Sequence, residues 1–401
     1  MTVASRVRRI YERRPYPPPP SRETSTSWAL NAIPWIEAVA ETPRVAEPRR
    51  ILIAGCGVGT EAFAFAKRFP AAEVVGVDFS PRSIATAKRL AGRWEVGDRV
   101  RFEVADLSGP DLPDIAGKAF DVISCHGVLS YIEDAVAVFR NFARCMTPDG
   151  IALLGVNGEA HPSVRWRSAL PTFGIDPEEF RETGRVRQTL RVFDSLTRYP
   201  PVSLAGTTAG YLAGDLFGPL NRAVSLREWV GMSGKAGLHL VATYNAYFAL
   251  RLLLNGDLHE ALMPRSRPEL DLLVDDLEPS SFHQIVLARR RPQRIAWNDG
   301  RSLLSLRPEL TGLYTVQWPP RRRRSWHRLG TVVLQSVTTQ TKITLEIPEW
   351  EIAILRGSDG TRSLRHLMEP VRPAVPARTL SAALYLVYLL GLIKLWPPEG
   401  R

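Results

Sequence analysis

The sequence predicts an α/β fold built around a nucleotide-binding βαβ unit, and residues 49–80 hold the pattern that predicts it. A short apolar run there ends in three glycines at alternate positions, Gly55, Gly57 and Gly59. Apolar residues at helical spacing follow, and a second apolar run then leads to Asp78. Strand, glycine turn, helix, strand and acid in this order are typical of a βαβ nucleotide-binding unit.

Each residue type in this segment has a physical use. Glycine tolerates positive φ and has no Cβ, so a ligand can approach the backbone closely. The helix that follows directs its free N–H groups at the ligand, and Asp78 is placed to accept hydrogen bonds from ribose hydroxyls. A dinucleotide fingerprint would need its last glycine or alanine at position 60 or 62. Thr60 and Ala62 stand there, which fits only the relaxed form and disfavours a nicotinamide cofactor.

The frame Gly55-Cys56-Gly57-Val58-Gly59 resembles motif I of the class I S-adenosylmethionine-dependent methyltransferases. Further segments resemble later parts of the same family, in the family's order. They are the acid-containing segment 102–107, the fourth strand and its loop at 120–129, the turn and fifth strand at 148–156, the sixth strand near 236–244 and the last strand at 281–289. The resemblance covers about residues 49–291.

The resemblance implies a Rossmann-like sheet of seven strands in the order 3-2-1-4-5-7-6, with only strand seven antiparallel. It implies S-adenosyl-L-methionine as cofactor, with Asp78 holding the ribose and Asp106, helped by the Leu107 backbone, addressing the adenine. The full set of expected cofactor-binding residues is Gly55, Cys56, Gly57, Gly59, Asp78, Phe79, Asp106, Leu107, Cys125 and His126.

One residue departs from the family pattern. The family usually has Asp or Glu two positions before the first glycine of motif I, and that acid helps to hold the loop and the amino group of the cofactor. Here the position is Ile53. A methyltransferase-like protein that binds or regulates without catalysis is therefore an alternative function.

Methyl transfer from a sulfonium needs position and desolvation more than a dedicated base. A base is required only if the acceptor must lose a proton. Candidates near the expected pocket are His126, Tyr131, Glu159 and His161. His126 follows the fourth strand, where related enzymes place residues that face the methyl group; packing against the adenine is the alternative. For Cys56 we expect the role of a small residue in the turn.

Length and cysteine content bound the class of protein. A chain of 401 residues is long enough for two domains with an extension. Its three cysteines are dispersed, so they indicate neither a disulfide framework nor a zinc site, and no metal is expected. No signal peptide is visible before Pro15, and we expect a cytoplasmic protein.

The formal net charge of +11 raises the possibility of a nucleic-acid partner. A coding bias toward arginine is the favoured explanation of the charge, and only 289–291 and 321–324 form basic runs. The loop after the fourth strand, 124–127, lacks the N-P-P-Y/F tetrapeptide of amino-methylating nucleic-acid enzymes, and no Pro-Cys pair suits attack on cytosine. A nucleic-acid methyltransferase is thus a disfavoured alternative.

We expect three parts along the chain. Residues 1–48 form an extension that caps the pocket, with Tyr11 and Tyr16 over the cofactor or packing the extension onto the domain. Residues 49–293 form the methyltransferase domain, with a long insertion at 157–224 that covers the active site and a helical insertion at 246–278 before the last strand. Asp176-Pro177 predicts the start of a helix in the first insertion.

Residues 294–401 are expected to form a small α+β domain. Apolar alternation at 303–316 and 331–346 predicts strands, and the turn 357–364 before a helix weakly resembles winged-helix and PqqD-like peptide-binding modules. Residues 380–396 are too short for a membrane span and predict a core helix running into a strand. The expected function is therefore methylation of a small molecule or of a peptide that this domain recruits as a partner.

Overall fold

The structure is a computed structural model of the full chain. It describes residues 3–13, 28–39, 47–176, 188–189, 191–192, 214, 218–244, 265–320, 326–337, 340–371 and 375–398. Contacts divide the chain into two compact units. The first unit is Met1–Leu30, Glu47–Leu240 and Asp275–Arg291, and the second is Asn31–Ala46, Val241–Val274 and Pro292–Arg401. The domain boundaries expected after residues 48 and 293 stay predictions.

Some sequence predictions fall outside the described residues. They are Tyr16 with the polyproline run 15–20, the helix expected from Pro177, most of the insertion 246–278 and the basic run 321–324.

A seven-stranded sheet organises the fold. Its strands are β1 (Arg50–Ala54), β2 (Glu73–Asp78), β3 (Val100–Val104), β4 (Phe120–His126), β5 (Met146–Asn157), β6 (His239–Thr243) and β7 (Phe282–Ala288). Their order is β3-β2-β1-β4-β5-β7-β6. The first five pair in parallel, and β7 pairs antiparallel with β5. The predicted Rossmann-like fold and strand order are confirmed.

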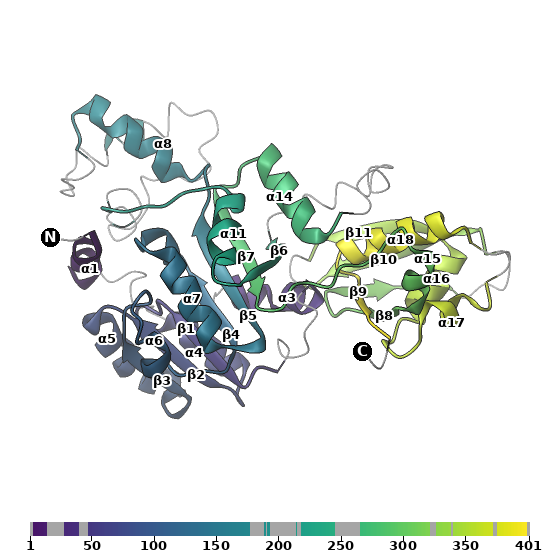
Figure 1. The fold of residues 1–401 in the computed structure, drawn as a ribbon, viewed down its shortest axis with the longest axis horizontal. Coiled ribbons are helices and arrows are strands. Elements are labelled where there is room, and N and C mark those ends of the chain that lie inside the picture. The colour runs from purple at the N-terminus through teal and green to yellow at the C-terminus, as the bar shows by residue number, and fades with distance from the viewer. Residues whose placement is uncertain are drawn as a thin grey trace. The chain divides into compact units, whose positions relative to one another are not determined.

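The described part of the first unit contains seven labelled helices, of which α4, α5 and α7 lie on the sheet (Figure 1). They are α1 (Val3–Arg13), α4 (Thr60–Arg68), α5 (Pro81–Ala91), α6 (Leu112–Ile115), α7 (Ala135–Cys145), α8 (Pro162–Ala169) and α11 (Leu226–Gly234). Helix α4 contacts β1 and β2, α5 contacts β2 and β3, and α7 contacts β5. The sheet is covered by helices, and the central strands accordingly consist of almost continuous apolar runs that are buried.

Capping residues set where the helices begin. Ser80 precedes Pro81, and its side chain accepts a hydrogen bond from the Ser83 N–H. The predicted capping box at the start of α11 is present between Ser225 and Glu228. Helix α8 was not predicted, although His161 followed by Pro162 is a usable start signal. It lies inside the expected insertion 157–224, whose first residue is also the last residue of β5.

The second unit contains two small sheets and helices. Strands β9 (Tyr314–Gln317), β10 (Leu329–Ser336) and β11 (Lys342–Pro348) form one sheet, and β8 (Arg307–Leu310) pairs with β12 (Ile393–Trp396) in the other. The helices are α3 (Ile33–Val39), α15 (Gly300–Ser305), α16 (Glu349–Arg356), α17 (Leu364–Met368) and α18 (Ala377–Leu389). Helices α2 (Trp28–Asn31) and α14 (Arg267–Leu277) cross the sequence boundaries between the units.

One strand prediction in this unit is wrong at its start. Residues 303–305 belong to α15, because Asp299 caps that helix by accepting a hydrogen bond from the Arg301 N–H at 3.0 Å. The predicted helix and strand within 380–396 are confirmed as α18 and β12, with Gly391 between them at φ 68°. None of the helices that the structure describes is long and apolar enough to cross a membrane. The winged-helix resemblance stays a prediction.

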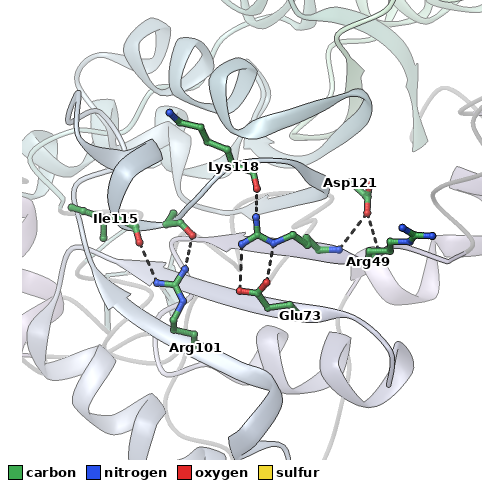
Figure 2. Close-up of polar contacts among 8 residues, drawn as sticks. Arg49, Glu73, Arg101, Ile115, Lys118 and Asp121 are labelled. Atoms are coloured by element: carbon green, nitrogen blue, oxygen red, sulfur yellow. Dashed lines mark hydrogen bonds and ion pairs between the residues drawn. The ribbon is translucent and has the colours of Figure 1, made fainter.

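The amino-terminal edge of the large sheet is held by polar contacts (Figure 2). Arg50 Nε donates to Glu73 Oε2 at 2.8 Å, and the Arg50 guanidinium also donates to the Lys118 carbonyl. Asp121 Oδ2 accepts hydrogen bonds from the backbone N–H groups of Arg49, at 2.8 Å, and Arg50, at 3.3 Å. These contacts tie the starts of β1, β2 and β4 together.

Candidate functional site

The glycine turn between β1 and α4 lies at the opposite, carboxyl-terminal edge of the sheet. Its three glycines adopt left-handed φ values, Gly55 75°, Gly57 52° and Gly59 91°. A Cβ on Gly59 would lie 2.7 Å from the Phe63 ring and 3.0 Å from the Phe102 ring. Conformation and close packing therefore both require glycine in this turn.

Asp78, the last residue of β2, holds the turn in place. Its Oδ2 accepts a hydrogen bond from the Gly57 N–H at 2.9 Å, and its Oδ1 accepts one from the Ser80 N–H at 2.9 Å. Burial raises the pKa of this carboxyl, and the two backbone hydrogen bonds oppose the rise. The carboxylate thus bridges the glycine turn to the start of α5, and it is buried.

The loop after β3 brings a second acid to the same edge. The Ala105 N–H donates to the Asp78 carbonyl at 3.1 Å, which joins this loop to the end of β2. Asp106 is exposed, and its Oδ1 accepts hydrogen bonds from the Ser108 N–H at 2.8 Å and the Ser108 hydroxyl at 2.7 Å. Leu107 is buried, and its carbonyl accepts a hydrogen bond from Asn141 Nδ2 at 2.9 Å.

Helix α1 lies against α5, next to the residues that follow β2. The ring of Tyr11 meets the ring of Phe79 edge-on, with centroids 6.2 Å apart. Glu12 Oε1 accepts a hydrogen bond from the Ser80 hydroxyl at 2.9 Å, and Arg82 donates to the Glu12 carbonyl at 2.8 Å. The extension therefore reaches the residues that follow Asp78.

His126 ends β4 and is exposed at this edge. Its ring lies directly over Gly155 of β5, where a Cβ would come within 1.8 Å of His126 Cδ2. It also meets the Phe282 ring edge-on at 5.3 Å. Surrounding protein lowers the pKa of the imidazole, and the negative charge of Glu61 opposes this shift. The imidazole is consequently neutral at pH 7.

A polar network that sequence reasoning missed extends from the end of β5. Asn157 Nδ2 donates to the Tyr131 hydroxyl at 3.2 Å and to Asn221 Oδ1 at 2.8 Å. Asn221 Nδ2 donates to Ser163 Oγ at 2.7 Å, and that hydroxyl lies 2.6 Å from His161 Nδ1. Two of the candidate bases, Tyr131 and His161, are thus joined through amides and a hydroxyl that are far apart in sequence.

The candidate bases differ in exposure and charge. Burial lowers the pKa of His161 to about 4, so this buried side chain is neutral at pH 7. Tyr131 is buried within the network. Glu159 is exposed. Among these four candidates, His126 combines an exposed ring with a place at the end of β4.

The cysteines have no features of a nucleophile. Cys56 and Cys125 are buried, and burial raises the thiol pKa of both well above the usual range. Cys56 instead packs in the turn, where its Sγ lies 3.1 Å from the position of a Cβ on Gly76. Within the described part of the chain, no three His, Cys, Asp or Glu side chains gather as a metal site.

Comparison with known proteins agrees with this geometry. Residues 52–152 match a family model described as a methyltransferase domain. The chain is 31% identical over 162 residues to an uncharacterized protein of Synechococcus; the matched region covers 39% of this chain and 38% of that protein. It is 30% identical over 141 residues to phosphoethanolamine N-methyltransferase 1 of Arabidopsis thaliana; the matched region covers 34% of this chain and 27% of that enzyme. The chain therefore spans well under half the length of these relatives.

A solved structure resembles the fold over most of the chain. It is PKMT2 from Rickettsia typhi in complex with AdoHcy, with a TM-score of 0.55 and 15% sequence identity, covering 95% of this chain and 77% of that one. The strand order, the glycine turn and the family match point to one conclusion. The chain carries a methyltransferase domain with the fold of the class I S-adenosylmethionine-dependent methyltransferases.

Proposed function

We propose that this protein binds S-adenosyl-L-methionine at the carboxyl-terminal edge of its sheet and transfers the methyl group to a small molecule or a peptide. The observation that supports this most is the bridge from Asp78 to the Gly57 N–H. It combines a turn in which three glycines adopt left-handed φ values with a buried carboxylate at the adjacent strand end. This combination suits a ligand that carries ribose hydroxyls.

The polar groups at this edge of the sheet fit the cofactor. Ribose hydroxyls need acceptors, and Asp78 supplies a carboxylate whose position is fixed by two N–H groups. Asp106 and the backbone of the buried Leu107 would contact the adenine. Phe79 completes the proposed contacts, whereas Cys125 is fully buried and would support the site from beneath without touching the ligand. The Rickettsia typhi protein of the same fold was solved with AdoHcy, which supports this assignment.

The chemistry asks little of the protein beyond position. When bound, S-adenosylmethionine would supply a methyl carbon on a sulfonium sulfur; the acceptor's bond to this carbon would form as the carbon–sulfur bond breaks and S-adenosylhomocysteine leaves. The chain aligns the reactants and excludes water. We propose His126 as the base for an acceptor that must lose a proton, because its neutral ring is exposed at the end of β4. A His126→Gln variant that binds cofactor but loses methyl transfer would support this role, and unchanged transfer would assign the ring to packing.

Helix α1 supports a capping role for the N-terminal extension. Its Tyr11 and Glu12 reach Phe79 and Ser80, the two residues after Asp78. We propose that this helix covers the ribose side of the pocket. We also propose that the protein is cytoplasmic. Residues 294–401 would recruit a peptide substrate to the methyltransferase domain. Deleting residues 294–401 should then impair methylation of a peptide and leave cofactor binding intact.

Calorimetric titration with S-adenosylmethionine and S-adenosylhomocysteine tests the proposal. Saturable binding is expected, weakened in Asp78→Ala by about 1–3 kcal/mol because buried hydrogen bonds to the ribose are lost. Glu73→Gln, at the other end of the same strand, is the matched control and should bind normally. A folded wild-type protein that binds neither compound would favour the non-catalytic alternative. A substrate screen with a labelled methyl group then separates small molecules from peptides.

A further inference from the structure

Position 53 poses a problem for the cofactor's amino group. The methyltransferase pattern places a carboxylate two residues before the first glycine of the turn, and this chain has Ile53. Ile53 is 1% exposed and packs within the sheet. An isoleucine in this place offers neither negative charge nor a hydrogen-bond acceptor. If the chain binds the methionine part of the cofactor, another group must meet the ammonium.

The register of the sheet shows which residues surround this position. Ile53 on β1 pairs with Ser124 on β4. Registered neighbours on parallel strands direct their side chains to the same face. The Ser124 hydroxyl donates to Oε1 of Glu61 at 3.0 Å. A carboxylate from the first turn of α4 therefore reaches the residue that lies beside position 53.

The charge of Glu61 is felt by other groups at this edge. It follows burial as a cause of the raised thiol pKa of Cys125, and it opposes the lowered imidazole pKa of His126. It also adds, after burial and Asp78, to the raised thiol pKa of Cys56. The carboxylate, which follows the glycine turn in the first turn of α4 and accepts a hydrogen bond from Ser124 of β4, is only partly exposed.

The other acids of this edge occupy different places. Asp78 ends β2 and is engaged by the Gly57 and Ser80 N–H groups. Asp106 follows β3, one strand farther from β4. Since β1 lies between β2 and β4, a ligand whose ribose meets Asp78 and which extends across the glycine turn would bring its far end to the Glu61 side.

We propose that Glu61 replaces the missing motif I acid and accepts the α-ammonium group of the cofactor. This inference rests on the proposed function and assigns the amino-acid subsite of that same pocket. Ser124 is the positioning residue, because its hydroxyl holds the carboxylate at the β1–β4 junction. A charge-assisted hydrogen bond in a partly buried place contributes more than a neutral one, so the carboxylate discriminates in favour of ligands with an ammonium group.

The test compares two ligands that differ at this subsite. S-adenosylhomocysteine carries the amino acid, whereas 5′-methylthioadenosine keeps the adenosine and lacks the ammonium and carboxylate groups. Calorimetry is done on the wild type, on Glu61→Gln, on Ser124→Ala and on the control Glu73→Gln. Glu61→Gln preserves size and an acceptor for Ser124 and removes only the charge. Circular dichroism melting confirms that each variant is folded.

Glu61→Gln should weaken S-adenosylhomocysteine binding at least tenfold, which corresponds to about 1.4 kcal/mol. Binding of 5′-methylthioadenosine should change less than twofold. Ser124→Ala should weaken the first ligand by a smaller factor and also spare the second. Equal weakening of both ligands, or no weakening of either, would overturn the assignment and leave Glu61 a structural residue.

Failure of the proposed function gives a different result. If the folded wild type binds neither ligand, the cofactor proposal itself is wrong, and the Glu61 assignment falls with it. If the wild type binds S-adenosylhomocysteine, and Asp78→Ala weakens that binding while Glu61→Gln leaves it unchanged, the cofactor site stands and only the Glu61 assignment is wrong.

Discussion

Charged residues have different roles at the two edges of the large sheet. At the amino-terminal edge, Arg50 pairs with Glu73, and Asp121 takes up backbone N–H groups at the start of β1. At the carboxyl-terminal edge, Asp78 fixes a turn of left-handed glycines, and the exposed His126 ends β4. Charge joins strands at the first edge, whereas at the second edge it fixes the glycine turn between β1 and α4.

This difference follows from parallel pairing. The strand-to-helix turns of a parallel sheet all lie at its carboxyl-terminal edge, and ligands bind there in open α/β sheets. Helix N-termini point to that edge and favour negative charge. The same substitution should therefore affect stability alone at one edge and cofactor binding at the other.

The largest expected effect comes from a single methyl group in the glycine turn. Gly59→Ala places a Cβ 2.7 Å from Phe63 in a left-handed residue with φ 91°. We expect a loss of unfolding free energy of about 1–2 kcal/mol from the backbone and about 1–3 kcal/mol from overpacking. Binding of S-adenosylhomocysteine should be lost as well. Urea unfolding and calorimetry measure the two effects.

The matched control for this variant lies near the other edge. Gly97→Ala adds a methyl group that meets no atom within 4 Å, and its stability should change by no more than about 0.5 kcal/mol. If Gly59→Ala behaved like Gly97→Ala in both measurements, neither backbone conformation nor close packing would require glycine at position 59.

An intermediate loss of unfolding free energy is expected when the pH falls, because His161 of the polar network is buried. His161 has a pKa of about 4 in the folded protein against 6.5 as its ordinary value, because it is buried. The unfolded chain therefore takes up the proton first as pH falls. The stability that His161 contributes is complete above about pH 6.5 and is lost as pH falls toward 4, by up to about 3 kcal/mol.

His161→Asn should flatten this part of the pH dependence. Asparagine retains the side-chain acceptor that caps α8 and does not titrate. Urea unfolding of the first unit between pH 4 and pH 7 should show a smaller decrease for the variant than for the wild type. An unchanged slope would mean that His161 is charged or exposed in the folded state.

The smallest effect is expected for the ion pair at the amino-terminal edge. Glu73→Gln removes the partner of Arg50, and both side chains are partly exposed, at 48% and 30%. Such pairs contribute about 0–1 kcal/mol. The variant should lose no more than this in thermal unfolding and should bind S-adenosylhomocysteine normally. A large loss of binding would erase the distinction between the edges.

The βαβ unit was predictable because local residues determine it. Three glycines at alternate positions, Gly55 to Gly59, favour a left-handed turn, and Ser80 before Pro81 is a helix start signal in any context. The family order of motifs then extended the prediction to the whole sheet. The strand prediction was wrong for residues 303–305 because alternating apolar residues also fit one turn of a helix. The Asp299 cap favours the helix over the strand there.

The polar parts of the site were only partly predictable. Asp78 stands at a position that the pattern marks, but the network of Asn157, Asn221 and Ser163 joins residues up to 64 positions apart. Glu61 was visible in the sequence as an ordinary acid in a first helical turn. Its proximity to Ser124 arises from the pairing of β1 with β4, which no local pattern records.

Hydrogen exchange measured by mass spectrometry, with and without S-adenosylhomocysteine, tests the central distinction most directly. The ligand should slow exchange in peptides that cover 54–61, 78–83 and 105–109, at the carboxyl-terminal edge. Peptides that cover 116–121 and 146–150, at the amino-terminal edge, should exchange at an unchanged rate. Protection confined to the amino-terminal edge, or saturable binding without protection of the glycine turn, would contradict the placement of the site.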